Sequence, residues 1–512
     1  LEPVTIAAQA AEAPRLTTLG VSPAAGVALS GTEPITFEVR LAYAGITPPA
    51  QFAPPLEIEN DCRWPALPPA LRALSPGAYT HPRGAHVGPL PRGFHLVHSP
   101  EATTGPAVLG DAAFARWQRF RAPAALRDEM DRQLAALALL QPLATTPALC
   151  AGAPDTLTAW LHVTNACNLD CPYCYVRKSS ARMSEATGQQ AVAAVFANAA
   201  RHGFRAVKLK YAGGEASLHF ALVRRLHDFA ARLSAESGIQ LYETLLTNGV
   251  HLRPDDADWL AEQRVRVMIS LDGVGEVHNA LRPLRNRAGF DTFAAVAHTV
   301  DHLLLTRAIR PAVNMVVTGR NAHGAADVAR WAILARGLPT TFTFYRPNLL
   351  SRDRAELQLE EAALRRGMLT AYDAIENDLP AWPFTGGLLD RVSTEARTHA
   401  CGVGQNYLVI THTGALSQCP MHLGQPVADD LQGDLLATAA AGPLLNLPVE
   451  QKTGCRDCTF RHRCAGGCPL ETFRATGRWD VQSPNCGLYR ALLPAVLRLE
   501  GLRLMKVNGY LQ

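Results

Sequence analysis

The most informative segment of the 512-residue chain is Cys167-Asn168-Leu169-Asp170-Cys171-Pro172-Tyr173-Cys174. Three thiolates in a CxxxCxxC pattern can ligate three irons of a 4Fe–4S cluster and leave the fourth iron open to a small ligand. A zinc site is the alternative, but structural zinc usually takes four ligands from paired CxxC motifs. The spacing therefore favours a cluster with one open coordination position.

At these residues the chain resembles the radical S-adenosylmethionine (radical SAM) enzymes, whose CxxxCxΦC motif has an aromatic residue where this sequence has Tyr173. In that family the amino and carboxylate groups of SAM chelate the open iron. An electron from the cluster then cleaves SAM to methionine and a 5′-deoxyadenosyl radical. The resemblance implies SAM as a cofactor, Cys167, Cys171 and Cys174 as cluster ligands, and Tyr173 as part of the cofactor site.

The middle of the chain alternates between expected strands and helices. Strands are expected near residues 157–163, 206–211, 239–246, 265–271, 312–318 and 340–345, and the helices between them include 184–203, 217–238, 290–305 and 325–335. About six such units imply an α/β fold with a parallel sheet. By the resemblance, this sheet is a partial (β/α)6 barrel with its chemistry at the C-terminal ends of the strands.

A glycine-rich motif, Gly213-Gly214-Glu215, follows the second expected strand. The glycines let the backbone approach a ligand closely, and the carboxylate can accept a hydrogen bond from an ammonium group. A simple turn is the alternative. The motif resembles the GGE motif of radical SAM enzymes, which holds the amino group of SAM.

Further polar residues, Ser270, Asp272 and Arg282, follow the fourth expected strand. In related enzymes this SLDG stretch contacts the ribose of SAM, and the arginine meets its carboxylate. The resemblance therefore implies that all three residues bind the cofactor. The alternative is helix capping by Asp272 and a surface position for Arg282.

A second group of cysteines lies near the C-terminus, at Cys401, Cys419, Cys455, Cys458, Cys464, Cys468 and Cys486. Their order and spacing resemble the SPASM domain of peptide-modifying radical SAM enzymes, which holds two auxiliary 4Fe–4S clusters. A zinc ribbon is the alternative, because CxxC and CxxxC pairs are common zinc sites. The resemblance implies three 4Fe–4S clusters in all, one of which binds SAM.

The resemblance also divides these cysteines between two clusters. It assigns Cys455, Cys458, Cys464 and Cys486 to an outer cluster, and Cys401, Cys419 and Cys468 to an inner cluster. Some relatives have a further cysteine where this chain has Tyr407, so the fourth ligand of the inner cluster stays open. Cys62 and Cys150 are left over, and such thiols are most often buried and inert.

The chain is expected to divide into several regions. They are an N-terminal α+β extension (1–150), the partial barrel (151–360), linker helices (361–398), the SPASM domain (399–490) and a C-terminal tail (491–512). Residues 41–110 of the extension are rich in proline, a short strand is expected near residue 95, and two or three helices are expected over 109–120 and 124–140. Residues 90–145 resemble in element order a winged-helix element that recognises peptides, and a plain packing extension is the alternative.

Composition excludes some classes of protein and partner. The net charge of +4 with 18% charged residues does not argue for nucleic-acid binding. No apolar run has the length of a membrane span, and no signal peptide is recognised. Cysteines at metal-type spacings in such a chain indicate a cytoplasmic protein.

A radical SAM peptide maturase is therefore the expected function, with oxidative modification or cross-linking of a ribosomally made peptide or protein. A flavodoxin or ferredoxin is expected as reductant. The alternatives are an anaerobic sulfatase-maturing enzyme, a non-catalytic iron–sulfur scaffold, and an oxidase with a SPASM domain that acts on a small molecule or in cofactor biosynthesis, which no residue excludes. The sulfatase-maturing enzyme has an aspartate directly after the second SPASM cysteine, where this chain has Pro420, although His422 could take a proton. No catalytic residue is assigned.

Overall fold

The computed structural model describes most of the chain from residue 74 onward. The described residues are 74, 76–102, 105–143, 154–393 and 396–511, together with the short strands β1 (Arg15–Leu16), β2 (Val27–Ala28) and β3 (Ile35–Thr36). Most of the proline-rich segment lies outside them, as do Cys62 and Cys150.

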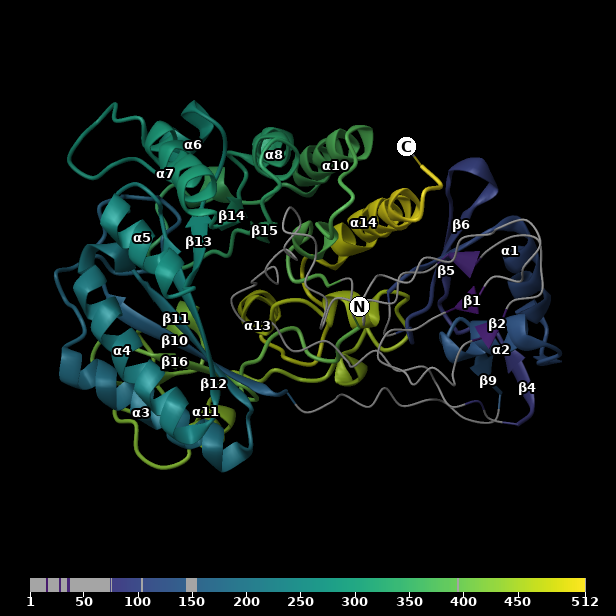
Figure 1. Cartoon of the computed structure of the whole chain (residues 1–512), viewed down its shortest axis with the longest axis horizontal. Coiled ribbons are helices and arrows are strands. Elements are labelled where there is room, and N and C mark those ends of the chain that lie inside the picture. Colours follow the sequence, from purple (N-terminus) through teal and green to yellow (C-terminus); the bar gives the residue numbers. More distant parts are fainter. Residues whose placement is uncertain are drawn as a thin grey trace.

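A parallel sheet forms the centre of the barrel region (Figure 1). Its six consecutive strands are β10 (Thr156–Thr164), β11 (Ala206–Gly213), β12 (Gln240–Thr247), β13 (Arg266–Ser270), β14 (Ala312–Val317) and β15 (Thr340–Phe344). Each pairs in parallel with the next along the chain. The expected α/β fold with a parallel sheet is confirmed.

Helices connect the strands and cover the sheet (Figure 1). They are α3 (Glu185–His202), α4 (Phe220–Ser237), α5 (Pro254–Glu262), α6 (Glu276–Leu281), α7 (Thr292–Arg307) and α8 (Ala325–Val328), which continues into a wider turn over Ala329–Leu334. The Ser184 side chain accepts from the Thr187 N–H and so caps α3. Leu157, Leu161 and Val163 of β10 are fully buried, because helices cover the sheet.

The sheet gains two more strands from the C-terminal region. β16 (Tyr407–Ile410) pairs in parallel with β10, and β17 (Leu416–Ser417) pairs antiparallel with β16. This hairpin lies between Cys401 and Cys419 in the sequence. The region expected to form the SPASM domain therefore shares a sheet with the barrel.

The remaining C-terminal elements are mostly short. They are α9 (Arg354–Leu357), α10 (Glu361–Asn377), η8 (Thr385–Gly387), α11 (Leu435–Ala440), α12 (Arg461–Cys464), α13 (Pro469–Thr476) and α14 (Cys486–Val507). The longest, α14, begins at a cysteine and runs without interruption past residue 490, where the sequence predicts the start of a tail. In the described part of the chain, no helix is long and apolar enough to span a membrane.

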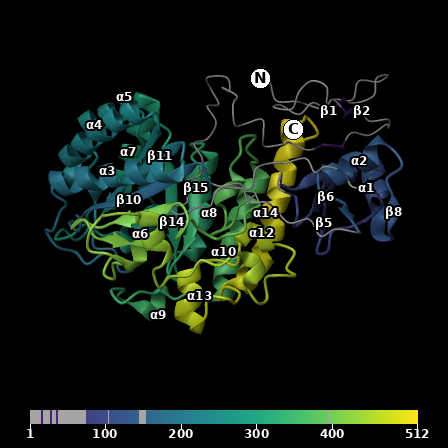
Figure 2. The same cartoon turned by 90° about the horizontal axis from the view of Figure 1, so that it is seen from below.

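The N-terminal unit lies on the far side of α14 from the barrel (Figures 1 and 2). Its elements are β4 (Ala78–Thr80), β5 (His86–Pro89), β6 (His95–His98), β7 (Ala107–Leu109), α1 (Asp111–Gln118), β8 (Ala124–Ala125), α2 (Glu129–Ala136) and β9 (Gln141–Pro142). A core of its own includes Val97, Trp117 and Leu134. The expected helix over 124–140 is too long, because Ala124–Ala125 pairs with β4 instead.

This unit packs against the loop that carries the C-terminal cysteines. Arg461 forms an ion pair with Glu101, and Arg463 donates to the Ala102 carbonyl at 2.8 Å. Arg463 is fully buried, although it carries a charge. Because a buried charge needs partners, these contacts fix the N-terminal unit beside the segment between Cys458 and Cys464.

Candidate active site and metal centres

The first cysteine set lies at the C-terminal end of β10, in the loop that leads to α3. The Cys174 N–H donates to the Cys171 carbonyl at 3.2 Å, which closes a tight turn. The loop is held from outside as well, because the Asp170 N–H donates to the Pro283 carbonyl at 3.0 Å. The three thiols are half-buried and face the edge where catalytic groups of such sheets gather.

The glycine motif packs directly on this cysteine loop. The Gly214 N–H donates to the Thr164 carbonyl at 2.7 Å, and the Glu215 N–H donates to the Ala166 carbonyl at 2.8 Å. A Cβ atom at Gly214 would lie 2.3 Å from the Ala166 oxygen. The motif therefore needs glycine here because the two backbones touch.

Gly214→Ala should disturb the cysteine loop. The added methyl group would collide with backbone atoms that cannot turn away, and such overpacking costs about 1–3 kcal/mol. We expect lower stability in denaturant unfolding and less 5′-deoxyadenosine formed per chain. Gly424→Ala is the matched control, since a Cβ there meets nothing within 4 Å. If Gly214→Ala and Gly424→Ala had the same unfolding free energy and the same yield of 5′-deoxyadenosine, this explanation would be wrong.

The Glu215 carboxylate is buried and already has three donors. It accepts from the Ser217 N–H at 3.0 Å, the Thr247 hydroxyl at 2.7 Å and the Asn248 N–H at 2.6 Å. A carboxylate offers about four acceptor positions. One acceptor position is therefore left, and its use by the SAM ammonium group stays a prediction.

Tyr173, Asp272 and Arg282 form one buried network. The Asp272 carboxylate accepts from Arg282 Nε at 2.8 Å and from the Tyr173 hydroxyl. Burial raises the pKa of Tyr173 well above its ordinary value, so the phenol keeps its proton and remains a donor. Arg282 is only 7% exposed, so the surface position considered for it is wrong. The network ties the cysteine loop to β13, while contacts of Ser270, Asp272 and Arg282 with SAM stay predictions.

His278 lies behind this network and is fully buried. Its Nδ1 accepts from the Asp272 N–H at 3.2 Å, and its Nε2 has no partner among the described residues. Burial, followed by the charge of Arg282, lowers the pKa of His278 to about 4. The ring is therefore neutral at physiological pH.

The free energy of unfolding should fall as the pH is lowered from about 6.5 to about 4. Over this range the unfolded chain binds a proton at His278 and the folded chain does not, because the folded pKa is about 4. The contribution is about 3 kcal/mol. His278→Asn keeps an acceptor near Asp272 without titrating, so its unfolding free energy should fall less. The measurement is the unfolding free energy from denaturant titrations at several pH values. If it fell by the same amount in the wild type and in His278→Asn, the expectation would be wrong.

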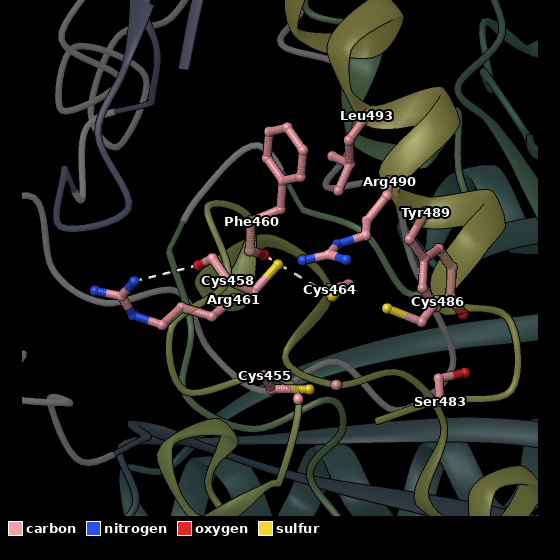
Figure 3. Close-up of a pocket in the computed structure, with 12 residues that line it drawn as sticks. Cys455, Cys458, Phe460, Arg461, Cys464, Ser483, Cys486, Tyr489, Arg490 and Leu493 are labelled. Carbon is pink, nitrogen blue, oxygen red and sulfur yellow. Dashed lines mark hydrogen bonds between the residues drawn. The ribbon is translucent and has the colours of Figure 1, made fainter. Parts of the chain in front are cut away.

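The second cysteine set includes four thiols around one pocket (Figure 3). Cys455, Cys458, Cys464 and Cys486 line a space of about 340 Å³, part of which is open to solvent. These are the four cysteines that the sequence assigns to the outer cluster. Arg490, on α14, extends toward the sulfurs and donates to Cys458.

The other three C-terminal cysteines share a different environment. Cys401 and Cys468 are buried and Cys419 is half-buried, in an apolar cluster with Trp160 of β10 and Tyr407 of β16. The buried Trp160 Nε1–H has no acceptor among the described residues. Such a donor requires a partner. A sulfur-rich group held by these cysteines would supply one, so the residues fit the inner cluster.

Burial makes several of these thiols unreactive. Burial raises the pKa of Cys171 to about 12, that of Cys455 to about 12 and that of Cys464 to about 11. A thiol with such a pKa is a poor nucleophile at neutral pH, whereas a bound metal deprotonates it. Among the described residues, no three His, Cys, Asp or Glu side chains converge on a point for a single metal ion.

Two lysines that the sequence did not single out, Lys178 and Lys452, lie near the cysteines. Burial lowers the pKa of Lys178, but the thiols of the first set raise it more strongly, so its pKa is raised overall. Lys452 is buried near both C-terminal cysteine groups. Their positions close to cysteine motifs, at four residues after Cys174 and three before Cys455, were the available signal.

The chain is similar in sequence to several known proteins. Residues 161–311 match the model of the radical SAM superfamily. The PqqA peptide cyclase of Streptomyces rochei is 28% identical over 374 residues, which cover 68% of this chain and 93% of that protein. The sporulation killing factor maturation protein SkfB of Bacillus subtilis is 29% identical over 189 residues, 37% of this chain and 42% of that protein.

A solved structure shows the same fold. It is described as native anSMEcpe with bound AdoMet and a Cp18Cys peptide, and it has a TM-score of 0.56 at 18% sequence identity. The alignment covers 68% of this chain and 99% of the solved chain. The fold is thus that of a radical SAM protein. This chain carries a radical SAM domain, with SAM and a 4Fe–4S cluster as its cofactors.

Proposed function

We propose that this chain is a radical SAM peptide maturase, which removes a hydrogen atom from a peptidyl substrate and oxidatively modifies or cross-links it. The observation that carries the proposal is the pair of cysteine environments outside the radical SAM loop, one around a pocket and one in an apolar cluster. Relatives whose names state peptide cyclisation or maturation support it.

The proposed ligands follow from the two sets of cysteines. Cys167, Cys171 and Cys174 bind the SAM cluster. The C-terminal cysteines bind two auxiliary clusters, so the chain holds three 4Fe–4S clusters. The glycine motif and the network at Asp272 hold SAM through Gly213, Gly214, Glu215, Tyr173, Ser270, Asp272 and Arg282.

The protein's own residues position and protect the reaction. When bound, the cluster and SAM supply a 5′-deoxyadenosyl radical. Glu215 has one acceptor position left for the SAM ammonium group, and the packing of Gly214 on Ala166 holds that carboxylate beside the cysteine loop. Burial of the Asp272 network keeps water away from the same edge of the sheet.

Formylglycine formation is the second candidate, because a cysteine-type anaerobic sulfatase-maturating enzyme of Clostridium perfringens is 21% identical over 336 residues, 60% of this chain and 86% of that protein. Pro420 follows Cys419 and offers no carboxylate. Burial lowers the pKa of His422, so this half-buried ring is neutral at pH 7 and can accept a proton. We place this candidate second because its expected aspartate is missing.

Two partners complete the proposal. A peptide is the substrate, and the N-terminal unit, which packs on the C-terminal cysteine loop, is the proposed site of peptide recognition. A flavodoxin or ferredoxin is the proposed reductant. A cytoplasmic location stays a prediction from the cysteine spacing.

The test is anaerobic. The protein is purified and reconstituted with iron and sulfide, its iron is counted, and 5′-deoxyadenosine is assayed after addition of SAM and dithionite. About twelve irons per chain, with deoxyadenosine formed, are expected for three 4Fe–4S clusters. Zinc in place of iron, or iron without deoxyadenosine, would instead indicate a non-catalytic scaffold.

A further inference from the structure

Lys452 is a buried cation in the region of the C-terminal cysteines. Its side chain is among the largest that are fully buried, with a residue exposure of 1%. Its Nζ donates to the Ala465 carbonyl at 3.0 Å, and its own carbonyl accepts from the Cys455 N–H at 3.1 Å. An ammonium group has three donors, so one carbonyl does not satisfy it.

The surroundings of Lys452 contain cysteines of both proposed auxiliary clusters. The Lys452 Nζ donates to the carbonyl of Ala465, in the loop between Cys464 of the outer set and Cys468 of the inner set, and the Lys452 carbonyl accepts from the N–H of Cys455 of the outer set. The two sets belong to separate environments, the pocket and the apolar cluster described above. Lys452 therefore lies within reach of both.

The backbone is shaped to admit this side chain. Gly466 follows Cys464 by two residues, and a Cβ atom there would lie 2.5 Å from Lys452 Cδ and 2.9 Å from Nζ. The φ angle of Gly466 is +77°, a left-handed conformation that glycine adopts readily. The loop between Cys464 and Cys468 thus leaves a channel that the lysine fills.

A buried ammonium group is costly unless negative charge lies close to it. The hydrogen-bond partner that the structure gives the Lys452 ammonium group is the Ala465 carbonyl, in a loop bounded by cysteines of both sets. Four cysteines around an iron–sulfur cluster carry net negative charge as thiolates. Metal-loaded cysteines on both sides would therefore provide the charge that a buried cation at this position requires.

We propose that Lys452 is a positioning residue that acts through both auxiliary clusters and raises their reduction potentials. Reduction adds negative charge to a cluster, and a fixed cation nearby stabilises the reduced form. Net charge and hydrogen bonds to sulfur are among the factors that set these potentials. The inference rests on the proposed function, because it requires that the auxiliary clusters exist.

The test is a redox titration of the reconstituted full-length chain, followed by electron paramagnetic resonance. Lys452→Met removes the charge and keeps the length of the side chain. We expect both auxiliary clusters to become harder to reduce, by at least tenfold in the equilibrium constant, or about 59 mV for a one-electron couple. The SAM cluster should be unchanged. Lys452→Arg should restore potentials close to those of the wild type.

Lys506→Met is the matched control. Lys506 is only partly buried, and like Lys452 it donates to a carbonyl, that of Leu379, at 2.9 Å, but it lies at the end of α14. This variant should leave all potentials unchanged. Unshifted auxiliary potentials in Lys452→Met would overturn the inference while leaving the proposed function intact. A wild-type protein with only four irons would overturn both, and it would do so before any variant is compared.

Loss of iron in Lys452→Met needs a second comparison, made with Lys452→Gln and Lys452→Arg. Iron retained by the arginine variant alone would mean that both clusters need the positive charge, which supports the inference. Iron lost equally from all three would mean that only the shape of the lysine matters, which overturns it. Iron content and potential are both independent of turnover.

Discussion

Cys171→Ala is expected to abolish SAM cleavage. Cys171 is the middle cysteine of the loop after β10, and its neighbours Cys167 and Cys174 alone cannot present a cluster with one open iron. We expect no 5′-deoxyadenosine above background in the anaerobic assay with dithionite. The expected loss of iron is about four atoms per chain, with the auxiliary clusters retained.

The matched control is the same substitution at Cys62, which no predicted cluster uses. Cys62→Ala should cleave SAM at the wild-type rate and keep its iron. If Cys171→Ala cleaved SAM at the wild-type rate, the cysteine loop could not be part of the active site. Loss of cleavage in both variants would point to general damage to the protein.

Cys458→Ala is expected to separate SAM cleavage from product formation. Cys458 lines the pocket together with Tyr489 and Arg490 of α14, and no residue of the loop after β10 is among the residues that line it (Figure 3). Its removal should leave 5′-deoxyadenosine formation within about threefold of wild type, a change of about 0.65 kcal/mol or less in the activation free energy. Modified peptide should fall below detection, because the outer cluster is needed as an electron path or as a structural support.

Asp457→Ala is the control for this experiment. Asp457 neighbours Cys458 in the same loop, but its side chain is 71% exposed and its partner, Arg83, is also exposed. It should retain both activities. If Cys458→Ala still held its other two clusters and yet lost all SAM cleavage, the division of work between the cluster sites would be wrong.

The parallel sheet could be predicted from the sequence because short segments rich in apolar, aromatic and β-branched residues alternate with helical segments. The strand expected at 340–345 is Thr340–Phe344, and the one expected at 239–246 is Gln240–Thr247. Local signals set such elements, since side-chain periodicity needs no distant partner. The start of α3 at Ser184 was predictable for the same reason.

The pairing of β16 with β10 could not be predicted in this way. Tyr407–Ile410 is only four apolar residues, and its register is set by contacts such as that of Asn406 Nδ2 with the Thr156 carbonyl, 250 residues away. The same holds for Lys452 and Trp160. A single lysine or tryptophan forms no periodic pattern, so the sequence does not show that Trp160 lies beside Cys401 and Cys468 or that Lys452, three residues from Cys455, is buried.

The pairing of β10 with β16 also affects how the chain folds during translation. During translation, residue 164 leaves the ribosome some 240 residues before Tyr407, so β10 has one unpaired edge for that interval. At about 5–20 residues per second this exposure lasts on the order of ten seconds or more. The cysteine loop after β10 is therefore synthesised well before β16, the strand that completes this edge of the sheet. A chaperone or an iron carrier has time to bind the loop during that interval.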